Sequence, residues 1–226
     1  MERPNLLGST EAVDESQDVL VSVVILNYNG LKYLKEGLAE CVDSVLASNY
    51  ANLEIIFVDN GSVDGSVEYI RKKYSSKIII VENRANLGWS KGFNNGIRAS
   101  NGEYIALLSN DMTVDPDWLN SILDLMAAEP KIGLAGFKRF AYGTTDVLDG
   151  IGGNMYLCGR VKLVGASEID RGQYDAVKDD LDYIGGAMVL RRQALKEVGL
   201  FNSDFYVFSY GSHHEHDQLF SPNALY

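Results

Sequence analysis

Apolar and polar residues over positions 19–131 form blocks that switch repeatedly between two patterns. Short runs rich in β-branched residues are typical of strands buried on both faces, as in parallel sheets. Longer segments with apolar residues every three or four positions are typical of helices. The pattern predicts strands at 19–28, 53–60, 77–83 and 102–111. It predicts helices at 31–48, 67–74, 91–100 and 116–128, with Asp115 as N-cap of the last and Pro116 in its first turn.

After residue 131 the pattern becomes less regular. Apolar runs at 132–140 and 182–192 predict two more strands, and 192–199 predicts a short helix. The glycine-rich segment 149–160 between them predicts turns and short antiparallel strands. Because strands and helices alternate through most of the chain, we expect an α/β fold with a mainly parallel sheet and right-handed crossovers.

The domain organisation predicted from the sequence is simple, since no segment has the composition of a linker. Residues 1–18 are polar and acidic, and we expect them to be a poorly ordered lead-in. Residues 19–205 are expected to form one domain, and residues 206–226 an atypical tail.

Polar residues follow three of the predicted parallel strands, in the segments "NYNG", "VDNGS" and "SND". In parallel sheets, ligands bind outside the carboxyl ends of the strands. We therefore expect Asn27, Asp59 and Asn110, with their neighbours, to line one crevice.

Composition narrows the range of partners. The formal net charge is −11, which argues against nucleic acid as a partner, because such binding needs Lys and Arg to neutralise phosphates. An acidic protein that binds a phosphate-rich anion needs a local positive charge, and a divalent cation is the usual source. Cys41 and Cys158 are far apart in sequence and are interpreted as two reduced core thiols, with a disulfide as the alternative. We find no secretory signal and no apolar run of roughly 18 residues, so the expected location is the cytoplasm, with a peripheral membrane role left open.

Three residues are candidates for binding a nucleotide, and each has a plainer alternative. Asp59 can accept hydrogen bonds from a base or a ribose, or it can cap a strand-to-helix turn. Lys91 can bind phosphate, or it can be a solvated surface lysine. Asp111 can bind Mg²⁺ or Mn²⁺ together with diphosphate oxygens, or it can begin a turn. For Asp111 we favour the metal.

Five segments in this order and spacing resemble the family 2 glycosyltransferases, which are inverting enzymes with the GT-A fold, and rhamnosyltransferase-like members in particular. The segments are "VSVVILNYNG", "VDNGSVDGS", "NLGWSKGFNNGI", "GEYIALLSNDMTVDPDWL" and "GGAMVLRRQALKEVGLF". The resemblance covers roughly Val19 to Phe205. It implies a Rossmann-like, mainly parallel sheet with helices on both faces and a small antiparallel part on the acceptor side. It also implies a nucleotide-diphospho-sugar donor, a divalent metal, and transfer with inversion to a hydroxyl of a saccharide or lipid-linked saccharide.

The resemblance also implies roles for individual residues. It implies that Asn27 and Tyr28 flank the nucleoside, that Asp59 binds the base or ribose, and that Asn60, in the turn that leaves room for the nucleoside, is a donor-binding residue. Lys91 is expected near the nucleoside or the phosphates. Asp111 is expected to bind the metal, and Asn110 stands beside it in the metal motif. The loop at Gly186 is expected to close on the donor sugar and the acceptor.

The resemblance ends after Phe205, where the family usually has an acidic pair that supplies the catalytic base. This chain has Tyr210 and Gly211 there, and the nearest carboxylates are Glu215 and Asp217 in the segment "HHEHD". Three interpretations stay open: a shifted loop in which Glu215 or Asp217 is the base, an altered C-terminus that leaves a nucleotide-sugar-binding remnant, and a polar exposed tail. The histidines of this segment are a poor zinc site, because no distant Cys or His completes a tetrahedral set.

Two other enzyme classes fit the sequence less well. A nucleotidyltransferase would usually have a glycine-rich, basic stretch after the first strand, and "NYNGLKYL" is a poor match to it. An NAD-dependent oxidoreductase would usually have GxGxxG in the first strand-to-helix turn, which this chain lacks.

Overall fold

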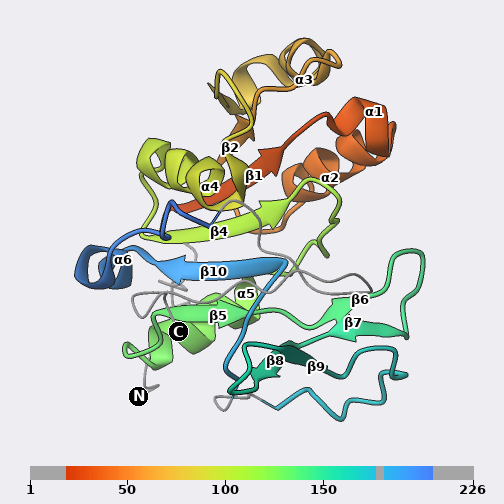
Figure 1. Cartoon of the computed structure of the whole chain (residues 1–226), viewed down its shortest axis with the longest axis vertical. Coiled ribbons are helices and arrows are strands. Elements are labelled where there is room, and N and C mark those ends of the chain that lie inside the picture. The colour runs from red at the N-terminus through yellow and green to blue at the C-terminus, as the bar shows by residue number, and fades with distance from the viewer. Residues whose placement is uncertain (1–18, 177–180, 206–226) are drawn as a thin grey trace, which may run out of the picture.

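The computed structural model describes residues 19–176 and 181–205, which build one six-stranded central sheet and two small two-stranded sheets (Figure 1). The strand order in the central sheet is β3-β2-β1-β4-β10-β5. Neighbouring strands among the first four are parallel, whereas β10 is antiparallel to both β4 and β5. The central strands are β1 (Val21–Asn27), β2 (Leu53–Asp59), β3 (Ile79–Glu82), β4 (Tyr104–Ser109), β5 (Leu134–Gly136) and β10 (Ala187–Arg191).

Helices cover both faces of this sheet, as the α/β prediction requires. Buried side chains of α2, α3 and α5 pack on one face, and those of α4 and α6 pack on the other. The helices are α1 (Gly30–Leu34), α2 (Gly37–Leu46), α3 (Ser66–Tyr74), α4 (Gly88–Ala99), α5 (Asn120–Ala128) and α6 (Arg192–Val198), with a 3₁₀ turn η2 (Ser75–Lys77) after α3.

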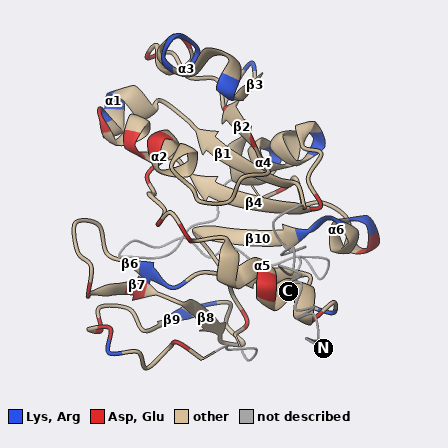
Figure 2. Ribbon diagram, turned by 180° about the vertical axis from the view of Figure 1, so that it is seen from behind, with Lys and Arg blue, Asp and Glu red and all other residues tan. Residues whose placement is uncertain are grey.

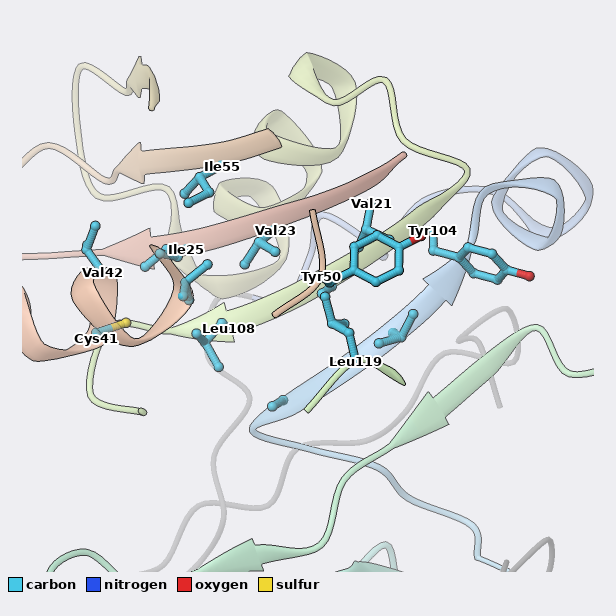
Figure 3. Close-up of a cluster of buried hydrophobic side chains, with 14 of the residues drawn as sticks. Val21, Val23, Ile25, Cys41, Val42, Tyr50, Ile55, Tyr104, Leu108 and Leu119 are labelled. Atoms are coloured by element: carbon cyan, nitrogen blue, oxygen red, sulfur yellow. The ribbon is translucent and has the colours of Figure 1, made fainter. Parts of the chain in front are cut away.

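The core lies around β1 and β4, two neighbouring central strands that carry no charged residue (Figure 2). Because successive side chains of a strand point to opposite faces, Val23 and Ile25 join the cluster under α2, whereas Val24 joins the cluster under α4. Figure 3 shows the first of these clusters, where Cys41 and Val42 of α2 meet Ile25 and Leu108. A strand that is apolar on both faces is stable only in the middle of such a sandwich.

The remaining strands lie outside the central sheet. β6 (Arg139–Phe140) pairs with β7 (Leu148–Gly150), and β8 (Gly152–Met155) pairs with β9 (Val161–Val164), both antiparallel. These four strands, referred to below as the small sheets, lie beyond the β5 edge (Figure 1). The short antiparallel strands predicted for the glycine-rich segment are therefore present.

The structure corrects several predicted boundaries. The helix expected at 31–48 is divided into α1 and α2 at Lys35, whose φ of 53° is incompatible with a continuous right-handed helix. The strand expected at 132–140 is divided between β5 and β6, which belong to different sheets. The helix expected at 91–100 already begins at Gly88.

The segment before α5 also differs from the prediction. The helix begins only at Asn120, so Pro116 lies in a preceding turn and not in the helix. Asp115 is not its N-cap; instead Asp115 Oδ1 accepts a hydrogen bond from the Asp117 N–H at 2.9 Å and so caps that turn. Both cysteines are free, as expected, but only Cys41 is a core thiol, because Cys158 is exposed in the turn between β8 and β9. Within the described residues, no helix has the length and apolar character needed to cross a membrane.

Candidate functional site

The three polar segments singled out in the sequence meet at the carboxyl edge of the parallel strands. β1 is flanked by β2 and β4, and the register places Asn27 opposite Asp59 and Leu26 opposite Ser109. Asn110 and Asp111 follow directly after β4. Three strands that point the same way thus end side by side, and their polar ends form one site.

Hydrogen bonds connect these ends. Asn27 donates from Nδ2 to Asp59 Oδ1 at 2.9 Å and to Ser62 Oγ at 3.1 Å. The Asn27 Oδ1 atom accepts a bond from Asn110 Nδ2 at 2.7 Å. Asp59 Oδ2 accepts bonds from the N–H groups of Gly61 and Ser62 at 3.1 and 2.8 Å. Asn27 is fully buried and Asp59 is 2% exposed, so this network is part of the protein interior at the floor of the site.

Asn60 was expected to help bind the donor, but its side chain is occupied by the protein. Its Nδ2 donates to Asn86 Oδ1 and to the Gly88 carbonyl, each at 3.0 Å. Its Oδ1 accepts from Asn83 Nδ2 and from the Leu87 N–H, each at 3.1 Å. Since an amide has two donor hydrogens and two acceptor lone pairs, these four bonds use its full capacity. Asn60 therefore anchors the loop that leads from β3 into α4.

Tyr28, Lys91 and Asp111 are the predicted site residues that remain accessible. The ring of Tyr28 is 44% exposed just beyond β1, Lys91 is exposed near the start of α4, and Asp111 is exposed after β4. Burial, and next the negative charge of Asp111, raise the pKa of the Cys41 thiol to about 12. Cys41 is therefore protonated at neutral pH, and the oxygens of Asp111 are the groups beside it that suit a hard cation.

The donor set at Asp111 can be compared with what a divalent cation needs. In the described part of the chain, no group of three or more His, Cys, Asp or Glu side chains is arranged to hold a metal. Mg²⁺ and related hard cations are often bound through one or two carboxylates, with substrate phosphates and water as the other ligands. A single exposed carboxylate fits a cation that is bound jointly by the protein and by the diphosphate of a substrate.

The loop before β10 approaches this edge of the sheet from the other side. Gly186 has a φ of 83°, and a Cβ added there would lie 2.7 Å from Met112 Cε, close to Asp111 in sequence. The positive φ favours glycine here, and the Cβ of any other residue would also require the Met112 side chain to shift. Gly186 thus lies beside Met112, the residue after Asp111, and closure of its loop on the donor sugar and acceptor stays a prediction.

Arg139 is a site residue that the sequence analysis missed. It donates from Nη1 to the Gly185 carbonyl at 2.5 Å and from Nε to Asp149 Oδ2 at 3.0 Å, and its side chain is only 9% exposed. It thereby connects β6 and β7 to the loop that contains Gly186. The available signal was a charged pair, Lys138–Arg139, inside an otherwise apolar run.

Glu215 and Asp217, the two candidates for the catalytic base, lie outside the described residues, as do Tyr210, Gly211 and the histidines of "HHEHD".

Comparison with known proteins identifies the family. The model of the family described as glycosyl transferase family 2 matches residues 22–199, which is most of the chain and runs from the second residue of β1 to the end of α6. The chain belongs to glycosyltransferase family 2.

Relatives from several bacteria are named glycosyltransferases. An uncharacterized glycosyltransferase of Haemophilus influenzae is 30% identical over 119 residues, which are 52% of this chain and 36% of the relative. One from Rickettsia conorii is 28% identical over 184 residues, which are 81% of this chain and 28% of the relative. The glycosyltransferase GlyG of Streptococcus pneumoniae is 35% identical over 107 residues, which are 46% of this chain and 34% of GlyG. The family 2 chain thus spans about a third of the length of these relatives.

Solved structures confirm the fold predicted for this glycosyltransferase. The mannosyltransferase PcManGT of Pyrobaculum calidifontis, solved with GDP-Man and Mn²⁺, superposes with a TM-score of 0.57 at 19% identity, covering 82% of this chain and 48% of that one. TarS of S. aureus, solved with UDP, superposes with a TM-score of 0.58 at 16% identity, covering 83% of this chain and 51% of that one. The fold is the GT-A fold, with its mainly parallel sheet and small antiparallel part.

Proposed function

We propose that this glycosyltransferase transfers a sugar, with inversion and with the help of a divalent metal, from a nucleotide-diphospho-sugar to an acceptor hydroxyl. The observation that carries the proposal is the meeting of Asn27, Asp59 and Asp111 at the carboxyl edge of β1, β2 and β4. Two structural neighbours lend support, because one was solved with GDP-Man and Mn²⁺ and another with UDP-GlcNAc.

Each site residue has a proposed task; Tyr28, Lys91 and Asp111 are accessible, whereas Asp59 is 2% exposed. Tyr28, beyond β1, flanks the nucleoside, and the edge of the Asp59 carboxylate receives a hydrogen bond from the base or ribose. Lys91 faces the diphosphate and opposes the charge that develops on the leaving oxygens. Asp111 would hold Mg²⁺ or Mn²⁺, and the bound cation would supply Lewis-acid stabilisation of the diphosphate charge. The loop at Gly186 closes on the donor sugar and the acceptor.

The acceptor is a saccharide or lipid-linked saccharide, as in polysaccharide biosynthesis. A lipid-linked acceptor would place the protein in the cytoplasm at the inner face of the membrane, as a peripheral protein. Glu215 or Asp217 would serve as the general base that accepts the proton of the attacking hydroxyl.

The donor-binding part is tested by titration calorimetry with UDP-, dTDP- and GDP-sugars in the presence of Mn²⁺. We expect one nucleotide class to bind, and we expect Asp111→Ala to abolish the dependence of its affinity on Mn²⁺. Asp115→Ala, which removes the same charge from the same segment, is the matched control and should bind like the wild type. Absence of binding to the whole panel, or Mn²⁺ dependence unchanged in Asp111→Ala, would contradict the proposal.

A second candidate function is a nucleotide-sugar-binding remnant without turnover, which the unusual segment after Phe205 favours. It is separated from the enzyme by product formation with the nucleotide sugar that binds and a panel of saccharide acceptors. An active wild type, together with loss of turnover in Glu215→Gln or Asp217→Asn at unchanged donor affinity, identifies the base. Donor binding without any turnover supports the remnant.

A further inference from the structure

A continuous chain of hydrogen bonds joins the ends of β4, β1 and β2. It runs from Asn110 Nδ2 to Asn27 Oδ1 at 2.7 Å, and from Asn27 Nδ2 to Asp59 Oδ1 at 2.9 Å. The partners are 83 and 32 positions apart in sequence. We propose that Asn110 is a positioning residue and not a metal ligand: it fixes the amide of Asn27 in the orientation that holds Asp59 in place. This inference rests on the role proposed above for Asp59 in nucleoside binding.

The direction of the chain follows from the chemistry of its last member. An ionised carboxylate can only accept hydrogen bonds, so Asn27 must turn its NH₂ group toward Asp59. The carbonyl oxygen of Asn27 then necessarily faces Asn110. Whatever residue stands at position 110 must therefore be a donor, and an ionised aspartate is not one.

Gly30 supplies a second, independent observation. A Cβ built on Gly30 would lie 2.3 Å from Asn27 Oδ1 and 2.9 Å from Asn110 Nδ2. Gly30 does not have a positive φ, so glycine is needed here for space and not for backbone conformation. Two residues of the motif "NYNG" therefore act together. Asn27 accepts the hydrogen bond from Asn110, and Gly30 leaves room for that bond.

This arrangement gives a physical reason for the sequence S-N-D where the family carries its metal motif. A carboxylate at position 110 would face the Asn27 carbonyl oxygen, acceptor against acceptor. If Asn27 turned over to relieve this, its oxygen would face the Asp59 carboxylate instead. The first outcome leaves a part-buried pair of acceptors without a proton between them and the second leaves a buried pair, and both are costly. Asn110 thereby couples the metal-binding end of the site to the nucleoside end.

The first test measures the affinity of UDP and GDP for wild type and Asn110→Asp by calorimetry, once with Mn²⁺ and once with EDTA. If Asn110 acts through Asn27 and Asp59, the variant binds the nucleotide about tenfold more weakly in both conditions. If Asn110 is a metal ligand, the added carboxylate tightens binding with Mn²⁺ and changes nothing with EDTA, and the proposal is overturned. Thr113→Asp, which adds the same charge to the exposed segment after β4, is the matched control and should show no loss with EDTA.

The second test needs no ligand and uses urea unfolding of Asn110→Asp, Asp59→Asn and the double variant. In the double variant the chain can run in reverse, because the amide introduced at position 59 can donate to Asn27 and Asn27 can donate to the carboxylate introduced at position 110. The amide oxygen at position 59 can still accept from the Gly61 and Ser62 N–H groups. We expect the double variant to be clearly more stable than the sum of the two single losses predicts.

Strictly additive losses would show that the three side chains are not linked as proposed. If wild type binds neither UDP nor GDP nor any nucleotide sugar, the proposed function fails, and the unfolding cycle alone decides whether Asn110 orients Asn27. If nucleotide binds but Asn110→Asp binds it as tightly as wild type, the inference fails and the proposed function stands.

Discussion

The parallel part of the sheet and the small sheets are held together by different forces. In β1 and β4 nearly every side chain is buried, and the packing is apolar on both faces. In the small sheets and their loops, several large apolar side chains are exposed, few apolar residues are buried, and ion pairs connect the segments. The exposed side chains include Phe140 at 40%, Tyr142 at 84% and Tyr156 at 54%.

Arg139 and Lys138 make most of the ionic contacts. Lys138 bonds to Asp170 at 2.7 Å and to Asp175 at 2.6 Å, and Arg139 bonds to Asp149. Apolar packing depends on volume and shape, whereas ion pairs depend on pH, salt and the presence of both partners. Substitutions in the two regions should therefore lower the free energy of unfolding by different amounts.

The largest effect is expected for a phenylalanine of the parallel part. Phe57 in β2 is fully buried, and Phe57→Ala should lower the free energy of unfolding by about 3–5 kcal/mol, because it removes a large side chain from a packed core. Phe140→Ala in β6 should change it by less than about 0.5 kcal/mol. Urea unfolding monitored by circular dichroism measures both, and equal losses would contradict the contrast between the regions.

A smaller effect is expected when the small sheets lose their connection to the Gly186 loop. Arg139→Met keeps the length and apolar stem of the side chain but removes its bonds to Asp149 and the Gly185 carbonyl, which should cost about 2 kcal/mol. The matched control is Arg71→Met, whose ion pair with Glu82 has both side chains 53% exposed and should contribute about 0–1 kcal/mol. A loss in Arg139→Met no greater than in the control would show that the connection does not stabilise the fold.

The smallest effect concerns pH. Burial raises the pKa of Glu54, but hydrogen bonds from Ser22, Asn101 and Gly102 outweigh it and hold the pKa below its ordinary value of 4.5. A carboxylate whose pKa is lower in the folded state stabilises the fold above the unfolded-state pKa, and that stability is lost as the pH falls through the folded-state pKa. Wild type should thus lose stability below about pH 4.5, and Glu54→Gln should lose less, by no more than about 1 kcal/mol.

The same measurement extends to the small sheets. The pKa of Asp170 is lowered first by the bond from Lys138 and then by the Gly172 N–H, so Asp170→Asn should also reduce the acid sensitivity. Thermal unfolding between pH 3 and 7 compares the two variants with wild type. Identical pH profiles for all three proteins would show that neither carboxylate contributes to stability.

The parts that could be predicted from the sequence are those that depend on local pattern. The runs around Val23 and Ala106 have apolar residues at consecutive positions, Val23 to Leu26 and Ile105 to Leu108, which already indicates a strand covered on both faces. The break at Lys35 could not be predicted, since the apolar positions of α1 and α2 continue the same spacing across it. The division of segment 132–140 into β5 and β6 could not be predicted either, because a run of apolar residues does not show that its two ends pair with different strands.

The local pattern of residues places Asn27, Asp59 and Asp111 at the ends of buried parallel strands, and hence at one edge of the sheet. Which hydrogen bonds each polar group makes depends on the folded structure. The side chain of Asn60 is fully occupied by hydrogen bonds to the loop before α4. Asp59 accepts a hydrogen bond from Asn27, and Asp111 is exposed. The physical reason is that strand position follows from the local alternation of side chains, whereas the hydrogen-bond partners of a buried amide come from segments that are brought together only when the sheet forms.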